Sequence, residues 1–490
     1  MSSSRIGGLT GRVTRGLVWT GASQVGGQGL HWGALLVLAW FVTPEAFGVV
    51  GFGVTCVSVL GALSEFGLGS ALIQRAEIED AHVVAVFWVS LAAATVLGAS
   101  MWAAAGLLAG IVHDPGAAPV LRALAPVIPA NTLALVPRIM LARGLDFKRP
   151  AIADLASEVA FTIVAIGMAC AGFGAWSLVC GIAARPVVRA ALLWGPWRSL
   201  PMRPFGWRHC RDVLGFSAFV MAHQMTTVFM ANVDNIVVGR FLGTAALGQY
   251  TLAFQLGVVP GQRLCEVLGR VAFPSFAAVH REPSRLSRGF VQMMRFSFLV
   301  AAPLAFFVPL TARPLIHAMY GAPWLPAAAA LQVLSATACF YAIDNSGLVL
   351  TAAGRPGWEF ALAALRASAF LVIVAVWGVA HGIVGVAASL FFASALAALV
   401  KVFLLEALVH VAWRDLMRAV SPALRAAVVA AASGVIVARW SVSEGAWQLA
   451  CTIGSMSLVY LTLVARDQFL SPSSTARLLG VPRGPMWGAP

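Results

Sequence analysis

Long apolar stretches separated by short polar loops run through this sequence from one end to the other. A helix that spans a membrane needs about 20 consecutive, mostly apolar residues. Fourteen stretches meet this requirement: 16–41, 47–73, 83–111, 120–142, 152–171, 175–194, 213–242, 245–276, 290–311, 327–353, 360–380, 383–409, 420–438 and 446–465. The pattern therefore predicts an all-α polytopic membrane protein with fourteen transmembrane helices.

The composition excludes a soluble protein. Hydrophobic residues make up 60% of the chain and charged residues only 11%, whereas charged residues are about a quarter of a typical soluble domain. The net charge of +14 would suggest a nucleic-acid partner in a soluble chain. Here no basic run is interleaved with aromatic residues, so we expect no nucleic-acid partner.

The arginines are concentrated in alternate loops. If the N-terminus is cytoplasmic, the loops on that side contain most of the Arg and Lys residues, whereas the opposite loops hold little beyond Arg313 and Arg439. Cytoplasmic loops of membrane proteins carry an excess of Arg and Lys. The asymmetry predicts that both termini are cytoplasmic, and it supports an even number of spans because one missed helix would disrupt the alternation.

The second part of the chain repeats features of the first part in the same order. Residues 40–48 correspond to 240–248, with Phe, Ala and Gly in register. Leu121, Leu124 and Gly144 similarly correspond to Leu331, Leu334 and Gly354. Parallel repeats are frequent in transporters. We therefore expect an N-terminal six-helix bundle at 1–195, a cytoplasmic linker at 196–212, a second six-helix bundle at 213–411, two additional helices at 412–466 and a disordered cytoplasmic tail at 467–490.

The sequence lacks the usual signs of catalysis. The loops expected outside are short, and the longest, 312–326, has about fifteen residues. Phosphate-binding loops, zinc-protease motifs and serine-hydrolase motifs are absent. The seven cysteines contain no C-x-x-C pair, and the nine histidines are scattered. We expect no metal, no cofactor and no enzymatic activity, which favours a transporter.

Several motifs point to one transporter family. Residues 233–250, which include Asp234-Asn235 and Gly239-Arg240-Phe241-Leu242-Gly243, resemble the seventh-helix signature of polysaccharide-unit flippases. Residues 66–75, 143–148, 270–274 and 320–326 add further similarity. Together, over residues 17–408, the chain resembles the lipopolysaccharide-exporter branch, with the colanic acid and teichuronic acid exporters, of the multidrug/oligosaccharidyl-lipid/polysaccharide superfamily.

This resemblance implies the substrate and the partners. Members move undecaprenyl-diphosphate-linked oligosaccharide repeat units across the bacterial inner membrane by alternating access, for lipopolysaccharide or exopolysaccharide biosynthesis. The expected partners are that lipid-linked oligosaccharide, the lipid bilayer, and the polysaccharide polymerase and export machinery. We expect a monomer.

A diphosphate crossing a membrane requires cationic side chains, and Arg suits this role because its planar fork binds phosphate oxygens bidentately. Arg263 and Arg270 are seven residues apart and share a helix face, with Glu266 within reach of both. Arg138 lies in the proline-broken fourth span, and Arg366 lies in the eleventh. These four arginines are the candidate substrate-binding residues, and structural ion pairs are the alternative.

Acidic residues are rare in the spans and are candidates for gating or ion coupling. Glu65 lies in the second span, Asp154 and Glu158 lie one turn apart in the fifth, and Asp234 lies in the seventh. Glu266 completes this set. Asp234 could pair with an Arg as a gate, bind a coupling cation, or hold two helices together.

Three other functions stay open at this stage. A cation-coupled multidrug exporter of the same superfamily should have an acidic interior, which the interior arginines oppose. A membrane glycan-processing enzyme usually carries large outside loops, which this chain lacks. An inactive scaffold with a transporter fold is the third.

Overall fold

The computed structural model describes residues 3–65, 72, 79–144, 146–195, 206, 228–229, 231–263, 268, 283–344, 350, 356–409, 411–440 and 446–469. These residues form helices joined by turns, and the described part contains no strand. The expectation of an all-α membrane protein is confirmed. By its internal contacts the chain divides into two compact units, Met1–Thr251 and Leu252–Pro490. The repeat-based division at 196–212 stays a prediction.

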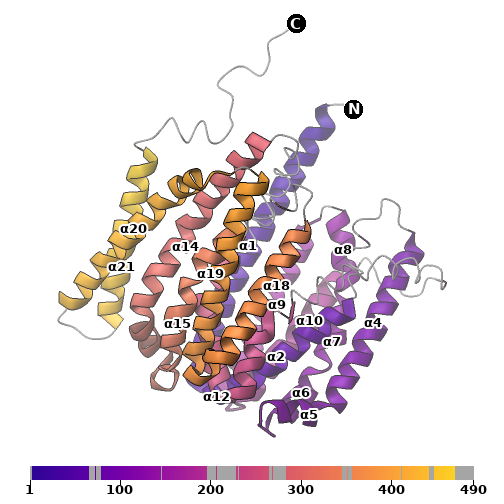
Figure 1. Ribbon diagram of the computed structural model, residues 1–490. Helices are drawn as coiled ribbons and strands as arrows, with labels where there is room; N and C mark the ends of the chain where they lie inside the picture. Colours follow the sequence, from indigo (N-terminus) through magenta and orange to yellow (C-terminus); the bar gives the residue numbers. More distant parts are fainter. Residues whose placement is uncertain are drawn as a thin grey trace. The chain divides into compact units, whose positions relative to one another are not determined.

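The first unit contains nine complete helices in the described part of the chain and the beginning of a tenth (Figure 1). They are α1 (Ser3–Phe41), α2 (Pro44–Glu65), α4 (Asp80–Ala103), α5 (Ala105–Ile111), α6 (Ala117–Leu124), α7 (Val127–Leu133), α8 (Leu135–Arg143), α9 (Lys148–Cys170), α10 (Ala175–Leu193) and α12 (Thr244–Gly257). A further helical stretch, residues 231–241, precedes α12.

The second unit is built on the long helix α14. Its described helices are α14 (Pro283–Tyr320), η3 (Ala322–Trp324), α15 (Ala327–Ala336), α16 (Ala338–Asp344), α18 (Pro356–Ile373), η4 (Val374–Gly378), η5 (Val379–His381), α19 (Gly382–Val409), α20 (Trp413–Trp440) and α21 (Ala446–Phe469). Helix α14 packs against α15 and α20, and α20 packs against α21. Buried residues from α14, α16, α18, α19, α20 and α21 form one hydrophobic core.

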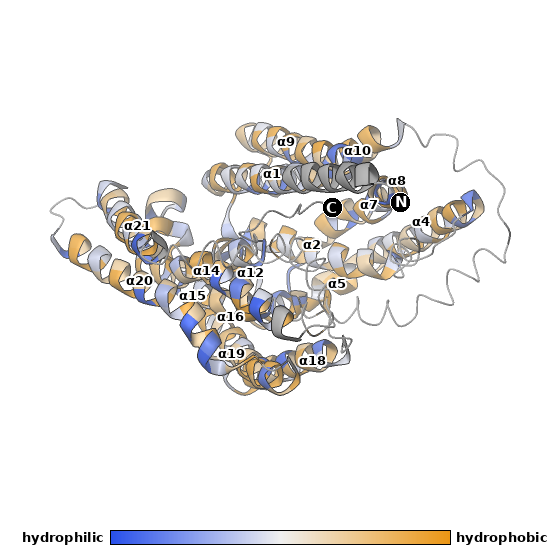
Figure 2. Ribbon diagram, turned by 90° about the horizontal axis from the view of Figure 1, so that it is seen from above, coloured by the Kyte–Doolittle hydropathy of each residue, from blue (hydrophilic) through white to orange (hydrophobic). Residues whose placement is uncertain are grey.

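The spans agree with the apolar stretches of the sequence. Ten helical stretches among the described residues are long and apolar enough to cross a membrane. One of them, Gly357–Leu408, contains 52 residues and covers two of the expected spans. Each of the fourteen expected stretches contains described helical residues. Many large apolar side chains are exposed, as expected where lipid replaces water. Orange marks the hydrophobic residues along the helix ribbons in Figure 2.

The proline-rich fourth span breaks into three helices, as its sequence predicts. Pro126 follows the end of α6, Pro129 lies in the first turn of α7, and Pro137 lies in the first turn of α8. Proline is tolerated in a first turn because the backbone N–H there has no intrahelical acceptor. The span remains one apolar stretch, Ala117–Arg143, while its backbone is interrupted twice.

The two segments that match in the repeat lie against each other in the first unit. A Cβ atom added to Gly48 would overlap the carbonyl oxygen of Thr244, and a Cβ atom added to Gly248 would overlap that of Pro44. The first turns of α2 and α12 therefore touch backbone to backbone. Close contacts of this kind between membrane helices require glycine or another small residue.

Candidate substrate site

Charged side chains from three spans meet in the first unit. Helix α9 packs along both α10 and α1. Asp154 and Glu158 lie one turn apart on α9, and Arg185 and Arg189 lie one turn apart on α10. Residues four apart lie on the same helix face. The equal spacing lets the two pairs face each other, and Arg138 from α8 joins them. We call Arg138, Asp154, Glu158, Arg185 and Arg189 the arginine–carboxylate cluster.

Asp154 binds two of the arginines. Arg138 Nη2 donates to Asp154 Oδ2 at 3.0 Å and Nη1 donates to Oδ1 at 3.4 Å, so the contact is bidentate. Arg189 Nε lies 3.0 Å from the same Oδ1, and Arg189 Nη2 donates to the Ser157 hydroxyl at 3.4 Å. The Arg138 side chain is 51% exposed, against 23% for Arg189. Arg138 is therefore the accessible edge of the cluster.

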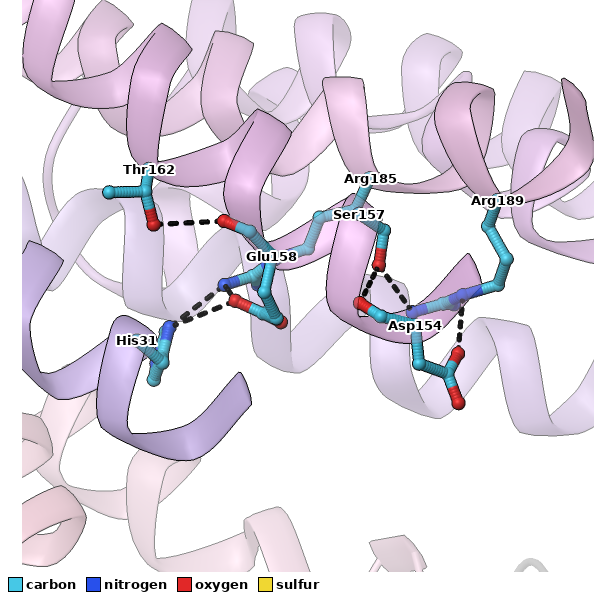
Figure 3. Close-up of polar contacts among 7 residues, drawn as sticks. All are labelled: His31, Asp154, Ser157, Glu158, Thr162, Arg185 and Arg189. Atoms are coloured by element: carbon cyan, nitrogen blue, oxygen red, sulfur yellow. Dashed lines mark hydrogen bonds and ion pairs between the residues drawn. The ribbon is translucent and has the colours of Figure 1, made fainter. Parts of the chain in front are cut away.

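Glu158 holds the remaining arginine one turn further along α9 (Figure 3). Arg185 Nη2 donates to Glu158 Oε2 at 2.9 Å and to His31 Nδ1 at 2.8 Å. Because Arg is always a donor, Nδ1 of His31 acts as the acceptor and its ring proton belongs on Nε2. The Arg185 guanidinium also lies 3.8 Å from the centre of the Phe161 ring. These contacts hold Arg185 rigidly.

Charges of both signs gather in and around the cluster. Three arginines face Asp154 and Glu158, and the Glu65 carboxylate on α2 is close enough to Arg138 to interact with it electrostatically. Asp154 is six residues, or about 9 Å along the helix, from the start of α9 at Lys148. A charge at that depth is costly in hydrocarbon unless it is paired or faces water. The bidentate pairing with Asp154 meets this requirement for Arg138, whose side chain is half exposed.

Two other predicted residues, Asp154 and Glu158, therefore lie in the same cluster as Arg138. Glu65 is the last described residue of α2, and its carboxylate interacts electrostatically with Arg138. Arg263 is described and exposed, whereas Arg270 and Glu266 lie outside the described residues. The predicted relation among these last three stays a prediction.

Asp234 is buried, with 4% of its surface exposed. The hydroxyl of Tyr250, on α12, donates to Asp234 Oδ2 at 2.9 Å. This bond links the helical stretch 231–241 to α12. Of the three roles considered for Asp234, the contact agrees with holding two helices together.

Sequence reasoning missed Arg185, Arg189 and His31. A signal was present, since two arginines one turn apart in the sixth span match the spacing of the two acids in the fifth. Adjacent spans are antiparallel neighbours, so matched spacing suggests a facing pair. His31 gave no such signal, because α1, which carries it, is distant in sequence from α9 and α10.

A second charged network lies in the other unit, and it includes the predicted Arg366. Arg366 Nη1 lies 3.2 Å from Asp344 Oδ2. Lys401 Nζ lies 2.8 Å from Asp344 Oδ1 and 2.9 Å from Glu359 Oε1. Lys401 was not singled out from the sequence because its partners Asp344 and Glu359 are 57 and 42 residues away from it.

The second unit also contains an apolar pocket of about 170 Å³. Its lining comes from α14, α16, α19 and α20 and consists of Phe298, Phe340, Ile343, Ala395, Ala398, Leu399, Val402, Trp413, Leu416, Met417 and Val420. No charged side chain lines it. Such a pocket suits an acyl or isoprenoid chain.

A family model described as "Polysaccharide biosynthesis protein" matches residues 37–329, more than half of the chain. The chain belongs to this family. The expected resemblance to polysaccharide exporters is thereby confirmed.

Curated relatives support the same assignment. The chain is 28% identical over 325 residues to the succinoglycan biosynthesis transport protein ExoT of Rhizobium meliloti, covering 66% of this chain. It is 27% identical over 303 residues to the teichuronic acid biosynthesis protein TuaB of Bacillus subtilis, covering 60% of this chain. The matches span 65% and 62% of the two relatives' own lengths, slightly less than two thirds.

Solved structures support the fold. The chain is similar to the lipid II flippase MurJ in an inward closed conformation, with a TM-score of 0.73. The similarity covers 92% of this chain and 99% of that protein at 14% identity. At this identity the likeness concerns the fold alone.

Proposed function

We propose that this protein is a flippase that moves undecaprenyl-diphosphate-linked oligosaccharide repeat units across the inner membrane by alternating access. Family membership supports this proposal, as do relatives whose names refer to succinoglycan transport and teichuronic acid biosynthesis. The protein performs no chemistry on its substrate, and a separate polymerase extends the glycan afterwards. It acts as a monomer with both termini in the cytoplasm.

The observation that carries the proposal is the pair of arginines held by Asp154. Arg138 and Arg189 share this one carboxylate, and Arg138 keeps half of its side chain exposed. A guanidinium presents several N–H donors in a planar fork, which matches phosphate oxygens. A diphosphate would bind at the exposed edge of Arg138, while Asp154 keeps both arginines oriented in its absence.

The other parts of the substrate need different surroundings. The isoprenoid tail requires apolar surface, and the glycan requires water. Accessible arginine at the site does not suit a cationic drug, and we therefore rank the multidrug exporter second.

The proposal is tested by a leaflet assay. Purified protein is reconstituted in liposomes with a fluorescent undecaprenyl-diphosphate oligosaccharide, and an impermeant quencher reports the fraction in the outer leaflet. We expect movement that depends on the protein and that weakens in Arg138→Ala and Arg189→Ala. Arg149→Ala is the matched control, because Arg149 lies on the same helix as Asp154 but forms an exposed pair with Asp146.

The outcomes separate the functions. Equal movement in Arg138→Ala, Arg189→Ala and Arg149→Ala would remove the cluster from the substrate site. Dye efflux without lipid movement in the same vesicles would favour the drug exporter. The same assay on Arg263→Ala and Arg270→Ala tests whether these two arginines contribute to the diphosphate site as proposed.

A further inference from the structure

The ammonium group of Lys401 sits among oxygens in the second unit. Lys401 lies on α19 and has 1% of its side chain exposed. Its Nζ donates to the backbone carbonyl of Asp344 at 2.9 Å and to Asp344 Oδ1 at 2.8 Å. Glu359 adds Oε1 at 2.9 Å and Oε2 at 3.3 Å. Two carboxylates and one peptide carbonyl thus surround one buried positive charge.

This oxygen set has the composition of a monovalent cation site. In secondary transporters, carboxylates and backbone carbonyls of membrane helices hold Na⁺. Asp344, on α16, supplies both a carboxylate and a backbone carbonyl to the Lys401 ammonium.

The charges of this network balance. Asp344 and Glu359 contribute two negative charges, and Lys401 and Arg366 contribute two positive charges. A free cation would therefore add an uncompensated charge to a buried site, which is unfavourable. If the Lys401 charge were removed, the oxygens of Asp344 and Glu359 would remain and the network would lack one positive charge.

We propose that the Lys401 ammonium is a tethered cation that permanently occupies a buried cation site formed by Asp344 and Glu359. Transport by this protein then needs no free Na⁺ or K⁺ at this position. This inference goes beyond the proposed substrate. Only its test in the leaflet assay rests on the proposed flippase function. Cation binding is measurable on the purified protein without any substrate.

The decisive variant is Lys401→Met, which keeps an apolar side chain of similar length and removes the charge. Thermal unfolding of the full-length protein in detergent is followed in NaCl, KCl and choline chloride at equal ionic strength. We expect the Tm of the unchanged protein to be the same in all three salts. Lys401→Met should have a lower Tm in choline, and Na⁺ or K⁺ should raise it.

Two controls separate site binding from general salt effects. Arg425→Met removes an exposed cation on α20 and should behave like the unchanged protein. The double variant Lys401→Met/Asp344→Asn restores the charge balance and should lose the response to Na⁺ and K⁺. It should also unfold at a higher temperature than Lys401→Met in choline.

The proposal fails if Lys401→Met and the unchanged protein respond equally to the three salts. It also fails if Lys401→Met yields no folded protein in any of them, since a free cation then cannot replace the ammonium. In the leaflet assay, Lys401→Met should acquire a dependence on Na⁺ or K⁺ that the unchanged protein lacks. If the unchanged protein moves no lipid, the proposed flippase function is wrong. The unfolding result on the Lys401 site does not depend on that outcome.

Discussion

At the scale of single residues, several charged side chains of the described spans are held by partners of opposite charge. Arg185 is held by Glu158, His31 and the face of Phe161, and only 21% of its side chain is exposed. A buried ion pair is weak evidence for stability, because desolvation offsets the attraction between the charges. Removal of one member of the pair is costly, because the other charge is left uncompensated.

This argument gives a prediction for Glu158. Glu158→Gln should lower the free energy of unfolding by roughly 3 kcal/mol, the lower end of the range for a broken buried pair, because both side chains keep some exposure. The double variant Glu158→Leu/Arg185→Leu should be close to the unchanged protein. Unfolding in mixed detergent micelles measures both. A double variant less stable than Glu158→Gln would contradict the argument.

At the scale of helices, a sequence repeat and a physical contact coincide. Gly48 and Gly248 match in the repeat, and the helices that carry them, α2 and α12, touch at these glycines. Nearby, the Thr244 hydroxyl donates to Asp114 Oδ2 at 3.2 Å, and Arg240 Nη1 lies 2.7 Å from His113 Nε2. The turn between α5 and α6 thus joins the same contact. At Gly48 and Gly248 the backbones of α2 and α12 are so close that no side chain would fit between them.

A substitution at this contact should be destabilising. Gly48→Ala should cost about 1–3 kcal/mol, the usual cost of overpacking, and toward the upper end because the obstructing atom belongs to the backbone. Gly61→Ala on the same helix is the control, since no described atom lies within 4 Å of its added Cβ. It should stabilise α2 by about 0.5–1 kcal/mol. Equal effects of the two variants on unfolding would show that the close contact is unimportant.

At the scale of the whole molecule, charge and hydropathy define how the chain crosses the membrane. Arg-rich loops alternate with Arg-poor loops along the whole chain. The orientation that follows is a prediction. It can be checked without any knowledge of the substrate.

Reporter fusions test this orientation. Alkaline phosphatase, which is active only outside the cytoplasm, should be active when fused after Asp114, in the turn between α5 and α6. It should be inactive when fused after Asp467, near the end of α21. A fluorescent protein that folds only in the cytoplasm should give the opposite pattern at the same sites. An active phosphatase after Asp467 would reverse the proposed orientation.

The sequence by itself determined the membrane class, the helices and the broken fourth span. The reason is physical: hydrocarbon offers no hydrogen bonds, so each apolar stretch must satisfy its backbone as a helix. Prolines mark where that helix is interrupted, because each removes a backbone donor. These effects are local, and a sequence displays them directly.

Only the tertiary structure decided which charges meet. Arg138 and Asp154 are 16 residues apart, and Lys401 and Asp344 are 57 residues apart. Such pairs form only after helices pack at a particular rotation and depth, which hydropathy leaves undetermined. The sequence thus predicted that Arg138, Asp154 and Glu158 matter without relating them. The packing of α8, α9 and α10 joined them to Arg185 and Arg189, and the packing of α16, α18 and α19 enclosed Lys401.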